Sequence, residues 1–269
     1  MEILQKEFEQ GNLIVNEDFV SILEKNGLLG AKALWQVDDE LVKAEIAERR
    51  TGRFYLSSQE ANKTEFYIKR YRNASLLKRI KDTLLFKKTG NDAFHEWKAL
   101  ILFHSNLLPT LIPVAAGRVD GWTFDVTLGL KNYKRASELL DTEGGLDPEH
   151  RLSLIQKVAV YAARMHMKGF AHQDLYLLHF FIKLPDMVPF LIDLQRVVIQ
   201  KRLRRRWVIK DLAELLFSSR LVLSEREIDY LFNTYSEEIG FDIRKDKRLF
   251  KDIEKKARWM MKRHLRKRS

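Results

Sequence analysis

The sequence contains no cysteine, which removes several classes of protein from consideration. Disulfide scaffolds, cysteine-bound zinc sites, iron–sulfur clusters and cysteine nucleophiles all require the missing thiol. Glycine and proline are also few, at 12 and 5 of 269 residues, which excludes fibrous and low-complexity chains. Because 45% of the residues are hydrophobic, the chain can still build a core. Its length fits one large domain or two lobes that share a cleft.

Long apolar runs are missing as well. The longest, such as residues 99–103, fall far short of the roughly 18 residues that a membrane span requires. The first ten residues, MEILQKEFEQ, carry acidic side chains and have no apolar core of the kind that defines a secretory signal. We therefore expect a cytoplasmic protein, with a peripheral position at the inner membrane left open.

Acidic residues are outnumbered, since 48 Lys and Arg face 37 Asp and Glu and give a net charge of +11. The excess lies mainly in residues 251–269 and in a second cluster, with a third between residues 70 and 88. The second cluster consists of Lys201, Arg202, Arg204, Arg205 and Arg206. Charge alone leaves three interpretations open: nucleic acid binding, an anionic lipid or substrate, or a solvated face.

The order of predicted elements is strands first and helices later. An antiparallel meander is expected over residues 41–48, 53–57 and 65–71, with turns at 49–52 and 60–64. Helices follow at 74–88 and from a cap at Asn91 or Asp92 to about 106. Two short strands, 113–117 and 122–128, precede a connection at 129–133.

Helices dominate the second half. A helix starts at Asp147-Pro148 and stops at Gly169, and two strands at 180–183 and 189–194 bracket a turn at Pro185. Further helices are expected from about Val208, from the capping box that begins at Ser224, and at the basic C-terminal end. The pattern predicts a small β-rich lobe followed by a larger α-rich lobe.

Two aspartates carry the chemistry. Asp174 follows a long helix on a turn, and Asp193 follows an apolar strand nineteen residues later, which is a layout for phosphoryl transfer. Asp174 would orient and deprotonate an acceptor hydroxyl, and Asp193 would hold Mg²⁺ on the nucleotide phosphates. In the first half, Lys69 at the end of a strand would contact phosphates, with Glu96 on the next helix as its partner.

At this point the sequence resembles the lipopolysaccharide core kinases of Gram-negative bacteria, the WaaP/InaA-type heptose kinases and related Kdo kinases. The resemblance runs from about Glu45 to the C-terminus. Its marks are RRTGRF (49–54), FYIKRY (66–71), NDAFHEW (91–97), PTLIPVA (109–115), HQDLYLLHF (172–180), IDLQR (192–196), RW (206–207) and KDLA (210–213).

The resemblance implies an α+β, two-lobed, protein-kinase-like fold. It has a small antiparallel β-rich N-lobe, residues 1–128, and a larger α-helical C-lobe, residues 129–269. It also implies ATP and Mg²⁺ as cofactors and a heptose or Kdo hydroxyl of the inner core as acceptor. The residues it assigns are Asp174, Lys69 and Glu96 for catalysis; Arg50, Thr51, Gly52, Lys69, Leu128 and Leu130 for ATP; and Asp193 and His179 for metal. The arginines that follow Asp193 lie where an acceptor would dock, so we expect acceptor binding by Arg196, Arg202, Arg204, Arg205 and Arg206.

The sequence differs from protein kinases at positions that bear on regulation and on the acceptor. Gln173 replaces the Arg that clamps a phosphorylated loop, and Leu194-Gln195 replaces the Phe-Gly of the regulatory segment. We infer an enzyme that is not switched by phosphorylation and whose acceptor is not a protein. His172 is expected to pack the catalytic loop, and Asp211 to brace it from the next helix.

The partners expected are lipopolysaccharide core or a related anionic glycolipid, and the inner membrane by peripheral contact. An acidic acyl carrier protein serves some relatives and suits a +11 chain, although no single residue points to it. Nucleic acid is disfavoured. Two alternatives stay open: another small-molecule or glycan kinase of this fold, and a non-catalytic basic pseudokinase-like binder of nucleic acid or membrane.

Overall fold

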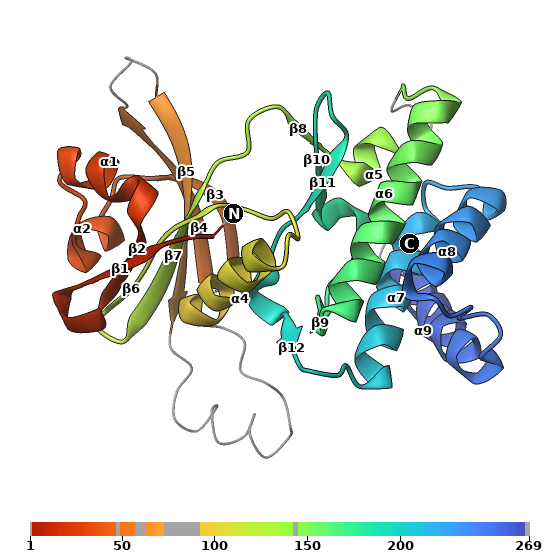
Figure 1. Cartoon of the computed structure of the whole chain (residues 1–269). Helices are drawn as coiled ribbons and strands as arrows, with labels where there is room; N and C mark the ends of the chain where they lie inside the picture. The colour runs from red at the N-terminus through yellow and green to blue at the C-terminus, as the bar shows by residue number, and fades with distance from the viewer. Residues whose placement is uncertain (1, 47–48, 58–62, 73–91, 142–144, 267–269) are drawn as a thin grey trace. The chain divides into compact units, whose positions relative to one another are not determined.

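The computed structural model describes residues 2–46, 49–57, 63–72, 92–141 and 145–266. They form two compact units that divide between Lys131 and Asn132. The first unit is built around one large sheet, and the second is mostly helical (Figure 1). The predicted α+β class is confirmed.

The first unit contains a seven-stranded antiparallel sheet in the order β1-β2-β6-β7-β5-β4-β3. Its strands are β1 (Gln5–Phe8), β2 (Leu13–Asn16), β3 (Glu40–Ile46), β4 (Arg49–Ser57), β5 (Lys63–Arg72), β6 (Pro113–Val119) and β7 (Trp122–Leu128). The β4–β5 register is continuous and sets Thr51 opposite Lys69.

Helices cover the two faces of this sheet (Figure 1). On one face, α1 (Val20–Lys25) and α2 (Ala31–Trp35) contribute Leu23 and Leu34 to a buried apolar cluster with Phe66 and Ile68. On the other face lies α4 (Ala93–Ser105), where the N–H of Ala93 donates to the Thr123 hydroxyl (3.3 Å). Because strand side chains alternate, Lys69 shares the α4 face and its neighbour Ile68 faces the apolar cluster.

The predicted strands at 65–71, 113–117 and 122–128 and the helix capped by Asp92 are confirmed. The predicted turn at 49–52 was wrong, because these residues form the first half of β4. The β1–β2 hairpin and helices α1 and α2 were not predicted at all. The predicted helix at 74–88 and residues 60–62 of a predicted turn lie outside the described residues.

The second unit combines small sheets with five helices of the described chain. Strands β8 (Tyr133–Arg135), β10 (Phe180–Lys183) and β11 (Val188–Leu191) form one sheet, and β9 (Phe170–Ala171) pairs with β12 (Val198–Ile199). The helices are α5 (Ala136–Leu139), α6 (Pro148–Met167), α7 (Arg205–Ser219), α8 (Glu225–Ile239) and α9 (Lys247–Arg266).

Local signals explain the helix boundaries. The Asp147 carboxylate accepts from the N–H groups of Glu149 and His150 at the start of α6, and Pro148 occupies the first turn. Ser224 and Glu227 form the predicted capping box of α8. Helix α7 begins at Arg205, three residues before the predicted start, so the basic cluster reaches its first turn. Among the described residues, no helix has both the length and the hydropathy to cross a bilayer.

Candidate active site

The first unit contains a buried ion pair on the α4 face of the sheet. Nζ of Lys69 lies 2.6 Å from Oε1 of Glu96, and the two side chains are 12% and 0% exposed. The other carboxylate oxygen of Glu96 accepts from the Tyr71 hydroxyl at 2.6 Å. A buried carboxylate with two donors has a fixed orientation. Lys69 is therefore held on a rigid support, as a phosphate-binding lysine requires.

Asp125 adds a second carboxyl group beside this pair. It lies directly opposite Lys69 in the β5–β7 register and is 1% exposed. Neither of its oxygens accepts a hydrogen bond from the described residues. Burial first, and then the Glu96 carboxylate, raise the pKa of Asp125 well above its ordinary value. Asp125 was not predicted as a site residue, although an acid within the apolar strand β7 is a signal for one.

We expect Asp125→Asn to stabilise the protein at alkaline pH. The folded protein keeps this proton to a higher pH than the unfolded chain, so wild-type stability is lost as the pH rises from about 4 toward the raised pKa. The asparagine variant escapes that loss. Its gain in the free energy of unfolding should be near zero at pH 4 and should grow as the pH rises to 8.

Urea denaturation at pH 4, 6 and 8 measures this difference. Asp38→Asn is the control, because Asp38 is exposed in the same unit. A difference that stays constant across the three pH values contradicts the raised pKa of Asp125.

The predicted phosphate-binding residues of β4 lie on both faces of the sheet. Thr51 shares the face of Lys69, whereas Arg50 and Gly52 lie on the opposite face with Asp39. The Asp39 carboxylate accepts from Arg50 (3.0 Å) and pairs with Arg70 (2.8 Å). A Cβ on Gly52 would lie 1.6 Å from Oδ2 of Asp39, so only glycine admits this carboxylate. Of the three, Thr51 alone directs its side chain to the Lys69 face.

The predicted hinge residues differ in their backbone bonding. The N–H of Leu128 donates to the Ile112 carbonyl (3.0 Å), and the N–H of Gly129 donates to the Glu65 carbonyl (2.8 Å). Within the described chain, Leu130 makes no backbone–backbone hydrogen bond. Adenine recognition through backbone groups therefore suits Leu130 better than the N–H of Leu128.

In the second unit, helix α7 holds the loop that carries Asp174. Asp211 accepts from the backbone N–H groups of His172 (2.6 Å) and Gln173 (2.7 Å). One turn further along α7, Glu214 accepts from the N–H of Leu175 (3.1 Å), and the Ser218 hydroxyl then accepts from the N–H of Leu177 (3.1 Å). The predicted bracing by Asp211 is thus extended by two side chains on the same helix face.

Two cations flank the Asp174 carboxylate. Nη1 of Arg196 lies 3.0 and 2.8 Å from its two oxygens, and Nζ of Lys210 lies 3.7 Å from Oδ1. Asp174 itself is 23% exposed, so a substrate can reach it. Lys210 also pairs with Glu214 at 2.5 Å. Burial raises the pKa of Glu214 to about 7, against the opposing effect of Lys210.

His172 and His179 connect the Asp174 loop to Asp193. The ring of His172 donates from Nε2 to the Ile192 carbonyl (2.9 Å), and the backbone carbonyl of His179 accepts from the N–H of Ile192 (3.0 Å). His172 is fully buried, as a packing role requires. Asp193 itself has φ 64°, in the left-handed region where aspartate is enriched among the non-glycine residues.

The donor set fits Mg²⁺ only in part. Asp193 offers a carboxylate, the ligand that Mg²⁺ prefers alongside waters and substrate phosphates. His179 donates from Nδ1 to the Asp174 carbonyl (2.7 Å), which leaves Nε2 as its acceptor atom. Burial, then His172, lower the pKa of His179 and keep the ring neutral. An imidazole nitrogen suits transition metals better than Mg²⁺. The described ranges hold no cluster of three or more His, Asp or Glu arranged around a metal.

The predicted acceptor-binding arginines differ in their contacts. Arg196 sits on Asp174, Arg205 pairs with Asp246 through two bonds of 2.7 and 3.0 Å, and Arg206 lies over the Trp207 ring at 4.2 Å. Arg202 and Arg204 are exposed near the start of α7. The N-terminus of a helix disfavours cations, so this concentration of arginine suits an anionic ligand.

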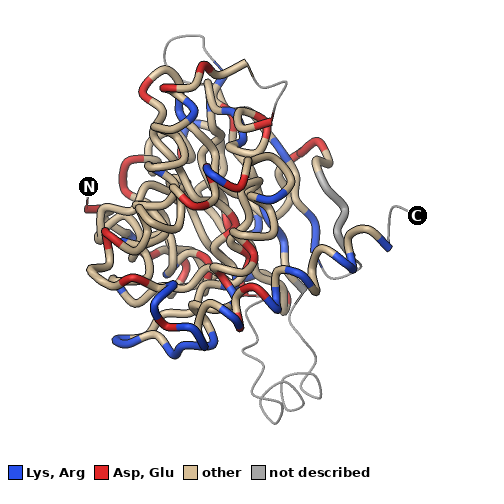
Figure 2. Tube along the Cα trace, turned by 90° about the vertical axis from the view of Figure 1, so that its right-hand side faces the viewer, with Lys and Arg blue, Asp and Glu red and all other residues tan. Residues whose placement is uncertain are grey.

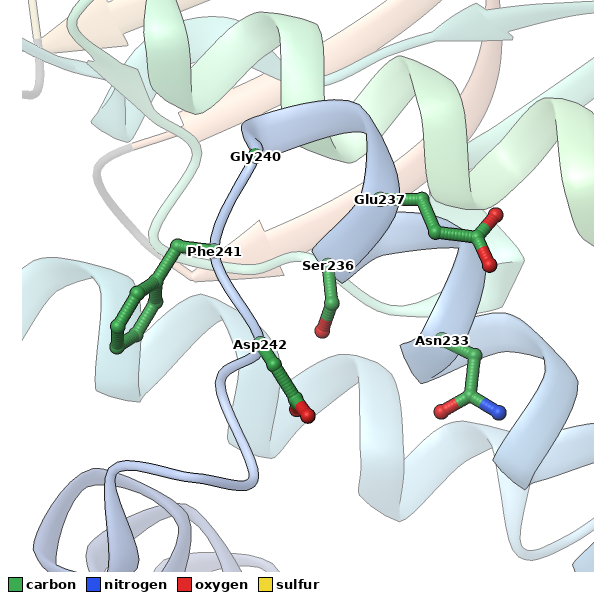
Figure 3. Close-up of a pocket in the computed structure, with 6 residues that line it drawn as sticks. All are labelled: Asn233, Ser236, Glu237, Gly240, Phe241 and Asp242. Atoms are coloured by element: carbon green, nitrogen blue, oxygen red, sulfur yellow. The ribbon is translucent and has the colours of Figure 1, made fainter.

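A pocket of about 390 Å³ lies elsewhere in this unit, where α8 ends at Gly240 (Figure 3). Asn233, Ser236 and Glu237 line it from the helix, and Phe241 and Asp242 from the following turn. The Ser236 hydroxyl binds the segment that follows α8, because it accepts from the N–H of Ile243 (3.3 Å). None of the predicted site residues lines this pocket.

Comparison with known proteins identifies the family of this chain. A model described as the lipopolysaccharide kinase (Kdo/WaaP) family matches residues 32–235, well over half of the chain. The chain belongs to this family. The resemblance inferred from the motifs is thereby confirmed. As a member of the Kdo/WaaP family, the protein is a phosphotransferase whose acceptor is an alcohol group of a sugar, and membership implies the use of ATP.

Curated relatives and a solved structure agree. The chain is 29% identical to lipopolysaccharide core heptose(I) kinase WaaP of Escherichia coli over 238 residues, which is 83% of this chain and 88% of that protein. The Pseudomonas aeruginosa WaaP is 27% identical over 208 residues, or 70% and 76% of the two chains. A structure of WaaP in complex with acyl carrier protein has a TM-score of 0.72 and 25% identity, and covers 91% of this chain and 98% of its own. The predicted kinase-like fold is confirmed.

Sequence reasoning missed three residues of α7 that contact the loop carrying Asp174. Lys210 lies in the KDLA motif but was assigned no role, and Glu214 and Ser218 were not predicted. Their signal is present in KDLAELLFSS (210–219), where polar residues recur on one face of an otherwise apolar helix.

Proposed function

We propose that this protein is an ATP- and Mg²⁺-dependent kinase that phosphorylates a heptose or Kdo hydroxyl of the lipopolysaccharide inner core, at the cytoplasmic face of the inner membrane. The observation that carries the proposal is the Asp174 loop. Its amides are held by α7 and its carboxylate is flanked by two cations, in a chain of a lipopolysaccharide kinase family.

In the proposed reaction the sugar hydroxyl attacks the γ-phosphorus of ATP. The new bond joins the sugar oxygen to phosphorus, the bond to the ADP oxygen breaks, and Asp174 accepts the hydroxyl proton. Lys69, fixed by Glu96, contacts the nucleotide phosphates together with Thr51, and the backbone of Leu130 receives adenine. Asp193 would hold Mg²⁺, which neutralises phosphate charge when it is bound.

The basic residues around Asp174 suit the proposed acceptor. Lipopolysaccharide inner core carries carboxylates and phosphates, and arginine pairs with such groups through two parallel hydrogen bonds. Arg202, Arg204, Arg205 and Arg206 are all exposed near the start of α7, and Arg196 is half-exposed at the proposed base. We assign acceptor recognition to Arg196, Arg202 and Arg204. Arg205 and Arg206, which already pair with Asp246 and Trp207, remain weaker candidates.

Helix α9 is the proposed contact with the membrane. Lys and Arg recur along this helix toward the C-terminus (Figure 2). Leu249, Ile253 and Ala257 are buried against the unit, while Trp259 and Leu265 are 56% and 58% exposed. A basic face flanked by exposed apolar side chains suits an anionic bilayer surface. By analogy with the solved WaaP complex, we also propose an acyl carrier protein as a partner of this basic chain.

The test is transfer of labelled γ-phosphate from ATP and Mg²⁺ to a panel of lipopolysaccharides that lack core phosphate. We expect transfer by the wild type, loss with EDTA, recovery on adding Mg²⁺, and loss in Asp193→Ala. The accepting member of the panel identifies the sugar. Nucleotide binding without transfer to any member would overturn the assigned acceptor. Absence of both would overturn the kinase and favour a basic binder, whose affinity falls steeply with salt.

A further inference from the structure

The loop that carries the proposed base supplies no cation of its own. Residues 174–179 read Asp-Leu-Tyr-Leu-Leu-His. None of these residues is Lys or Arg, and Nδ1 of His179 donates to the backbone carbonyl of Asp174 rather than to its carboxylate. The positive charge next to the Asp174 carboxylate must therefore come from other segments, and the structure offers Lys210 on α7 and Arg196 after β11.

Lys210 makes three polar contacts, two with the loop and one with its own helix. Its Nζ donates to the Gln173 backbone carbonyl, pairs with Oε1 of Glu214 at 2.5 Å, and lies 3.7 Å from Oδ1 of Asp174. The side chain is 22% exposed. Two of its three protons are donated, to Gln173 and Glu214, and the contact with Asp174 at 3.7 Å is an ion pair.

Lys210 binds the carbonyl of a residue whose backbone conformation is strained. Gln173 has φ 71°, the left-handed conformation that non-glycine residues adopt rarely and only where the surroundings enforce it. Asp211 accepts from the N–H of Gln173, while Lys210 binds its carbonyl. The peptide group that joins Gln173 to Asp174 is thus fixed from the side of α7.

Arg196 differs from Lys210 in its surroundings. It approaches both oxygens of Asp174 more closely, but it is 53% exposed, so water screens this pair and competes with it. Lys210 is better shielded and is anchored by the Gln173 carbonyl and by Glu214. Of the two cations, Lys210 is the less exposed and the one that also contacts Gln173 and Glu214.

We propose that Lys210 is a positioning residue that sets the direction of the Asp174 carboxylate for proton acceptance from the sugar hydroxyl. This inference rests on the role proposed for Asp174. It adds a residue that the catalytic loop does not contain, and it explains why a lysine stands one residue before the bracing Asp211.

The experiment compares Lys210→Met, Lys210→Arg and the control Lys183→Met, which removes an exposed lysine of β10. A displaced base lowers turnover by about two orders of magnitude. We expect Lys210→Met to lose about 30- to 100-fold in kcat, with the KM for ATP within about twofold of wild type. Lys210→Arg should recover at least about tenfold of that loss, because it keeps a cation at the site. The control should match wild type.

A double variant separates positioning from simple charge compensation. If Lys210 served only to neutralise Glu214, Glu214→Gln combined with Lys210→Met would regain wild-type kcat. We expect the double variant to stay impaired. Recovery in the double variant, or a kcat within about threefold of wild type in Lys210→Met, overturns the proposal.

Amide hydrogen exchange gives a measurement that does not depend on an acceptor. In Lys210→Met we expect the amides of residues 173–177 to exchange at least about tenfold faster, with no change in α8. Unchanged exchange in the loop overturns the proposal even if no substrate is found. Absent turnover by the wild type with faster exchange in the variant would instead refute the proposed kinase activity alone.

Discussion

Replacing Asp174 by Asn should abolish phosphoryl transfer while leaving nucleotide binding in place. The amide keeps the size of the carboxyl group but cannot accept the hydroxyl proton, and removal of a general base costs about 10²–10⁴-fold. The loop should keep its shape, because His179 and Tyr176 donate to the backbone carbonyl of Asp174. We therefore expect kcat to fall by about 10³-fold or more.

Two measurements check this result. Label transfer gives the loss of turnover, and calorimetry with an ATP analogue should give an affinity within about threefold of wild type, because Lys69 and Glu96 are untouched. Asp186→Asn is the control, since Asp186 is an exposed residue of the β10–β11 turn. A variant at Asp174 that keeps more than a tenth of wild-type kcat would remove this residue from the mechanism.

Replacing Asp211 by Ala should destabilise the protein more than any other change considered. Asp211 is fully buried and accepts from the N–H groups of His172 and Gln173, from the Gln173 side chain (3.3 Å) and from the ring of His166 (3.2 Å). Alanine leaves these donors in the interior without an acceptor. Loss of one member of such a buried network costs about 3–5 kcal/mol.

Urea denaturation followed by circular dichroism tests the expected loss. Asp229→Ala is a matched control, because Asp229 pairs with Arg244 at the surface with its side chain 59% exposed and should change stability by less than about 1 kcal/mol. Asp211→Asn, which keeps one acceptor oxygen, should fall between the two. A loss below about 1 kcal/mol in Asp211→Ala would mean that α7 does not hold the loop.

Sequence patterns located the elements that carry strong local signals. Asp147 and Pro148 mark the start of α6, and Ser224 and Glu227 mark the start of α8, because capping depends on residues within one turn. The strand periodicity of β5 and β7 is equally local. The family motif around Asp174 identified the proposed base and its loop through resemblance rather than through periodicity.

Structural features that depend on contacts between distant residues could not be predicted from local sequence patterns. Residues 49–52 have the composition of a turn, yet they form the first half of β4, where they pair with β5 and β3 and where Asp39 pairs with Arg50. The start of β4 is thus fixed by contacts with residues distant in the sequence, which outweigh local propensity. The hydrogen bonds between α7 and the Asp174 loop join residues 37 to 41 positions apart, so the local sequence pattern could not predict them.

The β1–β2 hairpin has a consequence for the solubility of shortened chains. Its strand β2 pairs with β6, whose residues Pro113 to Gly117 are buried. Strand β1, which contains Lys6 and Glu7, is then the edge strand of the sheet in place of β6. A charged outermost strand resists pairing with a second molecule, whereas an apolar one invites it. A fragment that starts at residue 32, where the family match begins, would expose the unpaired backbone of β6 and be prone to self-association. The residues that precede the family match thus protect the sheet from aggregation.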